Sequence, residues 1–159
     1  MRNVILSAIV VAGSISGLAS QLTAQSIEAP PGTRLLLEAT GEGTQVYRCT
    51  DGKWVLKAPD ARLLDAQRRE IGVHLAGPTW RLNDGSEVKG KMIASQPAPD
   101  GRSIPWLLVE AVPGSGSGKF AAVAYIRRTE TSGGTAPKET CITGELPVTY
   151  TAKYSFYTK

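Results

Sequence analysis

Alternating apolar and polar segments separated by turn residues constrain the fold of this chain more than any other feature. Asp51-Gly52 stands between residues 45–49, which alternate in polarity, and the apolar residues 54–56. An Asp-Gly pair between such segments is a strong signal for a β-hairpin. Asn83-Asp84-Gly85 separates residues 79–82 from residues 87–94 in the same manner. The chain is therefore expected to build antiparallel sheet from hairpins.

Further strands are expected where similar patterns recur, at residues 34–39, 104–112, 120–128 and 148–157. In the last of these segments Tyr150, Ala152, Tyr154 and Phe156 share one face, which we expect to face the core. Helix signals are weak, and only residues 59–70 could hold a short amphipathic helical turn. We predict an all-β fold: a single antiparallel β-sandwich or barrel-like domain of about nine to ten strands, with little helix.

The first 24 residues have the layout of a secretory signal peptide, with a basic start, a short apolar stretch and small residues near the expected cleavage point at 19–24. The apolar stretch is shorter than the ~20 residues that span a bilayer. Residues 25–159 then form one β-rich domain, secreted or periplasmic, with no transmembrane segment after signal removal. Cutting after Ala19 fits the small-residue rule best, and cutting after Ala24 is the alternative.

The two cysteines of the chain, Cys49 and Cys141, are expected to form a disulfide in an exported protein. They are 141 − 49 = 92 positions apart, and closing a loop of that length stabilises a fold by about 4–5 kcal/mol in the chain-entropy model. The alternative is a pair of buried free thiols. No metal site is expected, because structural zinc takes four ligands and the chain adds only His74 to its cysteines.

Charge and glycine patterns argue against two classes of partner. Without Arg2 the chain carries 17 basic and 14 acidic residues, and the basic residues are scattered rather than gathered in a stripe, so no nucleic acid is expected as a partner. Residues 114–118 alternate glycine and serine, but a strand is expected after them, whereas a dinucleotide-binding loop leads into a helix. No cofactor is therefore expected.

His74 is the only histidine, so any acid–base chemistry that uses histidine depends on it. The Gly77-Pro78 pair forces a bend that brings His74 near Trp80, and Asp84 follows in the next turn. One interpretation is a hydrolase in which His74 is the general base and Asp84 its partner. The serine of a triad would be Ser86 or Ser132, but neither lies in a G-x-S-x-G sequence. The favoured interpretation is a half-buried His74 that ties the bend to the sheet.

A binding surface is the other candidate site. Trp54 and Trp80 both stand at strand starts beside turns, where one edge of the indole can stay exposed, although aromatic residues in strands are more often part of the core. With His74 and Asp84 they make the candidate ligand-binding set. The expected partner is a small ligand or a component of the cell envelope, such as a surface polymer.

Several motifs resemble a family of secreted domains of unknown function from bacteria and fungi, whose fungal members often carry a malate-dehydrogenase label. The matching residues extend over nearly all of residues 25–159: Gly43-Thr44-Gln45-Val46-Tyr47-Arg48-Cys49, Trp54, Pro59, Ala61, His74-Leu75-Ala76-Gly77-Pro78-Thr79-Trp80, Asp84-Gly85-Ser86, Pro105-Trp106-Leu107-Leu108, Ile126-Arg127-Arg128, Thr131, Gly133-Gly134, Pro137, Cys141, Tyr150, Ala152, Tyr154 and Phe156-Tyr157.

The resemblance implies an exported, β-rich domain without an established activity. A dehydrogenase is not expected, since the cofactor loop is missing. Three functions remain as hypotheses: a non-enzymatic envelope or extracellular module that binds a ligand or polymer, a small secreted hydrolase that uses His74, and a structural or stress-associated surface protein. The first is preferred, so the chain is expected not to be an enzyme.

Overall fold

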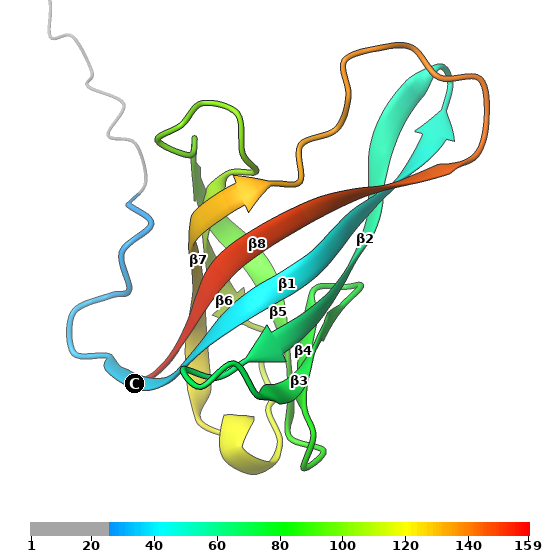
Figure 1. Cartoon of the computed structure of the whole chain (residues 1–159). Helices are drawn as coiled ribbons and strands as arrows, with labels where there is room; N and C mark the ends of the chain where they lie inside the picture. Colours follow the sequence, from blue (N-terminus) through cyan, green and yellow to red (C-terminus); the bar gives the residue numbers. More distant parts are fainter. Residues whose placement is uncertain (1–25) are drawn as a thin grey trace, which may run out of the picture.

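Eight antiparallel strands form a closed barrel in which each strand pairs with the next and β8 returns to β1 (Figure 1). This computed structural model describes residues 26–159, so the expected signal peptide lies outside the described residues. The strands are β1 (Arg34–Thr50), β2 (Lys53–Leu64), β3 (Glu70–Leu75), β4 (Thr79–Leu82), β5 (Glu87–Gln96), β6 (Trp106–Ala111), β7 (Val123–Gly133) and β8 (Glu145–Thr158), with a short 3₁₀ helix η1 (Gly118–Phe120) before β7. The predicted all-β antiparallel fold is confirmed, and of the two predicted forms, sandwich and barrel, the structure has the barrel.

Three details of the sequence-based prediction need correction. The described residues form eight strands rather than nine or ten. Residues 34–39 and 45–49, expected as two strands, belong to one continuous strand, β1. Residues 59–64 lie in β2 and form no helical turn, while residues 70–75 form a strand, β3, that was not expected. Phe120 ends η1 instead of beginning β7, because the chain makes a tight turn there before pairing resumes at Val123.

The barrel interior is filled by side chains. The expected inner face of β8 is confirmed, since Tyr150, Ala152, Tyr154 and Phe156 are each at most 2% exposed. Opposite them lie buried residues of the other strands, among them Leu63, Trp80, Val88, Val109 and Ile126. Ile27 packs outside the barrel against Ala94 and Leu108. Interiors packed in this way are typical of eight-stranded barrels, which have just enough room for side chains.

The long strands β1 and β2 project beyond the rest of the barrel together with the start of β8 (Figure 1). We call residues 45–58 and 141–148 the arm. The predicted disulfide is confirmed here: Cys49, near the end of β1, is bonded to Cys141 in the segment that leads into β8. Backbone hydrogen bonds from Cys49 N to Gly144 O (2.9 Å) and from Cys141 N to Gly52 O (3.1 Å) hold the same segment. The bridge thus joins the hairpin tip to the returning chain.

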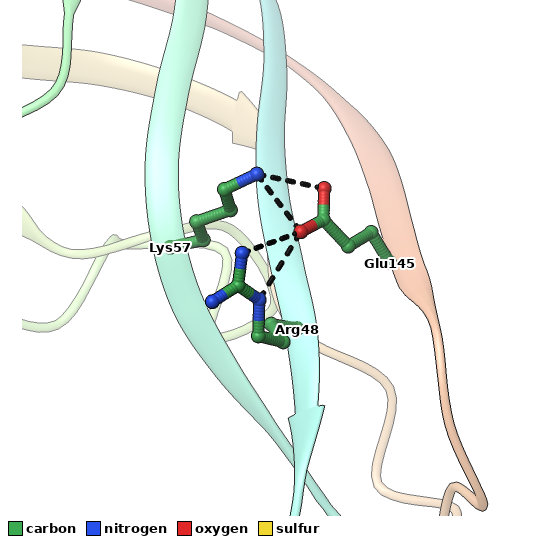
Figure 2. A network of polar contacts seen from close by, with 3 residues as sticks. All are labelled: Arg48, Lys57 and Glu145. Atoms are coloured by element: carbon green, nitrogen blue, oxygen red, sulfur yellow. Dashed lines mark hydrogen bonds and ion pairs between the residues drawn. The ribbon is translucent and has the colours of Figure 1, made fainter.

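An ion-pair network on the arm adds to this fastening (Figure 2). The Glu145 carboxylate accepts hydrogen bonds from Lys57 Nζ (2.8 and 2.9 Å) and from Arg48 Nε and Nη2 (3.1 and 2.9 Å). These bonds, Lys57 first, lower the pKa of Glu145. All three side chains are at least 40% exposed, and solvent-exposed pairs contribute little to stability. The disulfide is therefore the stronger of the two attachments.

The first part of β1 extends beyond its pairing with β2. β1 pairs with β8 from Arg34 onward, but it pairs with β2 only from Thr40 onward. Residues 34–39 therefore have one strand edge with no β2 partner. The register shift between Leu35 and Leu37 leaves Leu36 as a β-bulge in this stretch. The opening lies between the first part of β1 and the start of β3, and we call it the mouth.

Candidate functional site

A pocket of about 570 Å³ occupies the mouth. This volume is within the range of small-molecule sites, roughly 300–1,000 Å³. Five separate segments of the chain supply its lining: Leu36, Leu37, Asp65, Glu70, Ile71, Leu82, Asn83, Asp84, Lys119 and Phe120.

Apolar side chains form the inner wall of this mouth pocket. Leu37 and Ile71 pack against the barrel core, and behind them Leu82 and Phe120 are 8% and 0% exposed. Leu36 is 45% exposed at the entrance. The bulge explains why two consecutive leucines line one pocket, since an extra residue in a strand interrupts the regular alternation of side chains. The wall can bury an apolar molecule against carbon.

Polar side chains form the rim, and Asp84 is the predicted site residue found there. Its carboxylate accepts a hydrogen bond from Ser86 N (3.0 Å) and pairs with Lys119 Nζ (3.0 Å). Hydrogen bonds from Ser86 and then from Lys119 lower the pKa of Asp84 to about 2, so it is ionised at neutral pH. Ser86 Oγ accepts the backbone N–H of Lys119 (2.9 Å). Ser86 therefore fixes η1 against the turn that carries Asp84.

The structure places His74 and Trp80 side by side, but inside the barrel. They are paired residues of β3 and β4, and their rings stack at 4.5 Å with an interplanar angle of 6°. His74 is 3% and Trp80 2% exposed. Because a carbonyl oxygen can only accept, His74 Nδ1–H donates to Thr79 O (3.0 Å). Burial lowers the pKa of His74 to about 4, which leaves the ring neutral at physiological pH.

The other predicted combinations are not assembled. The polar contacts of His74 run to Thr79 and those of Asp84 to Ser86 and Lys119, so the two candidate catalytic residues share no contact in the described residues. Trp54 lies half-buried on the arm, outside the mouth pocket. A ligand-binding role for His74, Trp80 and Trp54 stays a prediction.

A second hollow of about 440 Å³ lies beside the turn after β2, with Glu38, Asp65, Glu130 and Lys153 among its lining residues. Lys153 Nζ pairs there with Glu38 (3.2 Å) and Glu130 (3.5 Å). Since its lining is more polar and charged groups already satisfy one another across it, the mouth pocket is the stronger candidate site.

Sequence reasoning missed most of the mouth pocket: Leu36, Leu37, Glu70, Ile71, Lys119 and Phe120. One signal was available, because Leu35-Leu36-Leu37 breaks the alternation expected of a half-buried strand. The remaining residues come from β3 and η1, neither of which was expected. Nothing in their local sequence indicates that they meet.

Fold and site together define a class: a small, disulfide-fastened, closed antiparallel β-barrel with a pocket at the mouth. Residues 30–158 match the model of the family described as "Protein of unknown function (DUF3455)", and the chain belongs to this family. The resemblance to a family of unknown function is thereby confirmed. No curated protein and no solved structure matches the chain. None of the described residues forms a helix long and apolar enough to cross a membrane.

Proposed function

We propose that this protein is an exported, non-enzymatic module that binds a small, mainly apolar ligand in the mouth pocket. One observation carries the proposal: the described residues contain a pocket of about 570 Å³ whose inner wall is apolar and whose rim is charged. Apolar walls with a few polar groups are typical of small-molecule sites, where the carbon surface supplies affinity and the polar groups fix orientation.

Export is supported by the disulfide and by the signal-like sequence of residues 1–24. Structural disulfides persist in oxidising compartments such as the periplasm and the extracellular space. The mature protein is then one domain, residues 25–159. Titration of the native protein with a thiol reagent should detect no free sulfhydryl, and detection of two would contradict this part of the proposal.

A binding role is favoured over hydrolysis because of the position of His74. A general base must reach a bound substrate or its water within hydrogen-bond distance. His74 is 3% exposed, is stacked on Trp80 and does not line the mouth pocket. The hydrolase interpretation therefore has no supporting observation in the described residues. A purely structural role remains as an outcome of the binding experiment.

The test is a fluorescence titration with N-phenyl-1-naphthylamine, a neutral apolar dye that brightens when bound. We expect saturable binding, weakened at least about tenfold by Leu36→Asp, because a carboxylate in an apolar wall must be desolvated when the dye binds. Leu35→Asp is the matched control. Leu35 is the neighbouring residue and is 54% exposed, compared with 45% for Leu36, but it does not line the pocket.

Circular dichroism of both variants should match that of the unchanged protein, so that a loss of binding is not a loss of fold. The proposal is overturned if the dye does not saturate, or if the Leu35 and Leu36 variants lose it equally. Either result would leave the structural role as the better explanation.

A further inference from the structure

We infer that the ligand of the mouth pocket is a cationic amphiphile: an apolar body with an amine or amidine group that pairs with Glu70. This inference rests on the proposed function and adds the charge of the ligand. It follows from the way in which the charged groups at the rim are paired with one another.

The rim contributes three carboxylates, Asp65, Glu70 and Asp84, and one ammonium group, Lys119. Asp65 already pairs with Arg69 at 2.7 Å, and Asp84 pairs with Lys119 at 3.0 Å. Hydrogen bonds from Arg69 lower the pKa of Asp65, as those from Ser86 and Lys119 lower that of Asp84. Each of these two carboxylates therefore has a close cation of its own.

Glu70 is different. Its nearest cation is Arg62 at 3.9 Å, and Arg62 also lies 3.7 Å from Glu42, with which Arg68 forms a closer pair at 2.7 Å. The Glu70 side chain is 46% exposed. Among the lining carboxylates it is thus the one with the weakest counter-charge, and it can accept a further cation without releasing a close partner.

The position of Glu70 connects this charge to the apolar wall. Glu70 begins β3 and is followed by Ile71, which packs against the core. Asp65 and Glu70 are among the residues that line the pocket, whereas their partners Arg69 and Arg62 are not. An ammonium group at Glu70 would form a charge-assisted hydrogen bond while its apolar body covers the leucine and isoleucine carbons.

An anionic amphiphile would meet the opposite conditions. It would approach Asp65 and Glu70, and its only attractive partner in the lining is Lys119, which is 73% exposed and already paired with Asp84. The repulsion between its negative charge and these two carboxylates disfavours binding, and an exposed ammonium group offsets little of that repulsion. The rim therefore selects for positive charge.

The experiment compares three ten-carbon probes below their micelle concentrations: decylammonium, decanol and decanoate, each used to displace N-phenyl-1-naphthylamine at pH 7. We expect decylammonium to displace the dye at about tenfold lower concentration than decanoate, with decanol between them. Glu70→Gln should abolish this order, because it removes the charge and keeps the shape. Glu139→Gln, an exposed carboxylate outside the mouth pocket, is the matched control and should keep the order.

The possible failures are distinguishable. Equal displacement by all three probes, with Leu36→Asp still weakening each of them, leaves the apolar pocket intact and overturns the cationic ligand. An order that survives Glu70→Gln overturns the role of Glu70. If the dye itself does not bind saturably, or if Leu36→Asp does not weaken binding of the neutral dye, the proposed function itself fails. Rising salt should reduce the preference for decylammonium, since salt screens exposed charges.

Discussion

At the scale of single residues, burial decides what the only histidine can do. His74 of β3 stacks on Trp80 of β4, and its Nδ1–H donates a hydrogen bond to Thr79 O. A charged imidazolium inside the barrel would have no water to solvate it. Burial therefore lowers the pKa of His74 to about 4, well below the ordinary 6.5. The residue is suited to a structural role at neutral pH.

This shift predicts a pH dependence of stability. The unfolded chain binds a proton on His74 below about pH 6.5, while the folded protein binds it only near pH 4, so in that interval protons favour unfolding. The stability that the protein owes to a neutral His74 is fully present above pH 6.5 and is lost as the pH falls to 4. It amounts to about 3 kcal/mol of the free energy of unfolding.

Urea unfolding of the natural protein and of His74→Phe between pH 4 and 8 measures this contribution. The phenyl ring can keep the stack on Trp80 but cannot be protonated, so the variant should lose about 3 kcal/mol less than the natural protein between pH 7 and 4. At pH 7 it should be less stable by about 1–3 kcal/mol, because Thr79 O loses its donor. Parallel pH curves for the two proteins would contradict the burial of a neutral His74.

The candidate site could be predicted only where it depends on neighbouring residues in the sequence. The Gly77-Pro78 bend was sufficient to place His74 beside Trp80, and the Asn83-Asp84-Gly85 turn was sufficient to place Asp84. The burial of His74 and Trp80 could not be predicted, because it depends on contact with β8, which begins about 70 residues later in the sequence. The mouth pocket was missed because its wall needs β1, β3 and η1 at once.

At the scale of strands, the clearest difference between expectation and structure is the continuity of β1. Two separate strands were expected on either side of Thr40-Gly41-Glu42-Gly43-Thr44, a stretch with the composition of a turn. In the barrel these glycines let the neighbouring strands β8 and β2 approach closely. A Cβ on Gly41 would lie 2.5 Å from the Tyr154 ring, and a Cβ on Gly43 would lie 2.1 Å from Asp60 O. Sequence composition alone does not distinguish close approach from a turn.

If Gly43 is needed for the close approach of β2, a single methyl group added at this position should disturb the barrel. In Gly43→Ala the new Cβ would also lie 2.5 Å from Ala61 Cα, so β1 and β2 must separate. We expect a loss of about 1–3 kcal/mol in the free energy of unfolding. The cost of overpacking outweighs the smaller stabilisation that alanine gives by restricting the unfolded chain. Thermal or urea unfolding provides the measurement.

Thr44→Ala serves as the control for this variant, since it changes the neighbouring residue without adding an atom. Its cost should stay below about 1 kcal/mol, the span of intrinsic strand preferences. If Gly43→Ala were as stable as the natural protein, Gly43 would be a flexible connection after all, and the continuous strand would be in doubt.

At the scale of the whole molecule, closure joins the two ends of the described chain. β1 and β8 pair from Arg34–Thr158 to Arg48–Glu145, so the most extended pairing in the barrel is also among the most distant in sequence. The β6–β7 pairing is close in sequence and much shorter, from Leu107–Arg128 to Glu110–Tyr125. Pairings distant in sequence slow folding, because a long loop must close before they form. The Cys49–Cys141 bridge keeps part of this loop closed in the native chain, so the argument applies to the protein with its disulfide reduced.

A circular permutant of residues 26–159 tests this argument. A flexible Gly/Ser linker of about 12 residues would join Lys159 to Ser26, and the chain would be opened between the exposed residues Pro113 and Gly114. The long β1–β8 pairing then becomes nearly local and only the short β6–β7 pairing becomes distant, so the reduced permutant should fold faster than the reduced protein of natural order. Stopped-flow tryptophan fluorescence, to which the buried Trp80 contributes, follows the reaction. A permutant that reaches the same barrel more slowly would show that pairing of β1 with β8 does not limit folding, whereas one that cannot form the barrel would contradict the closure itself.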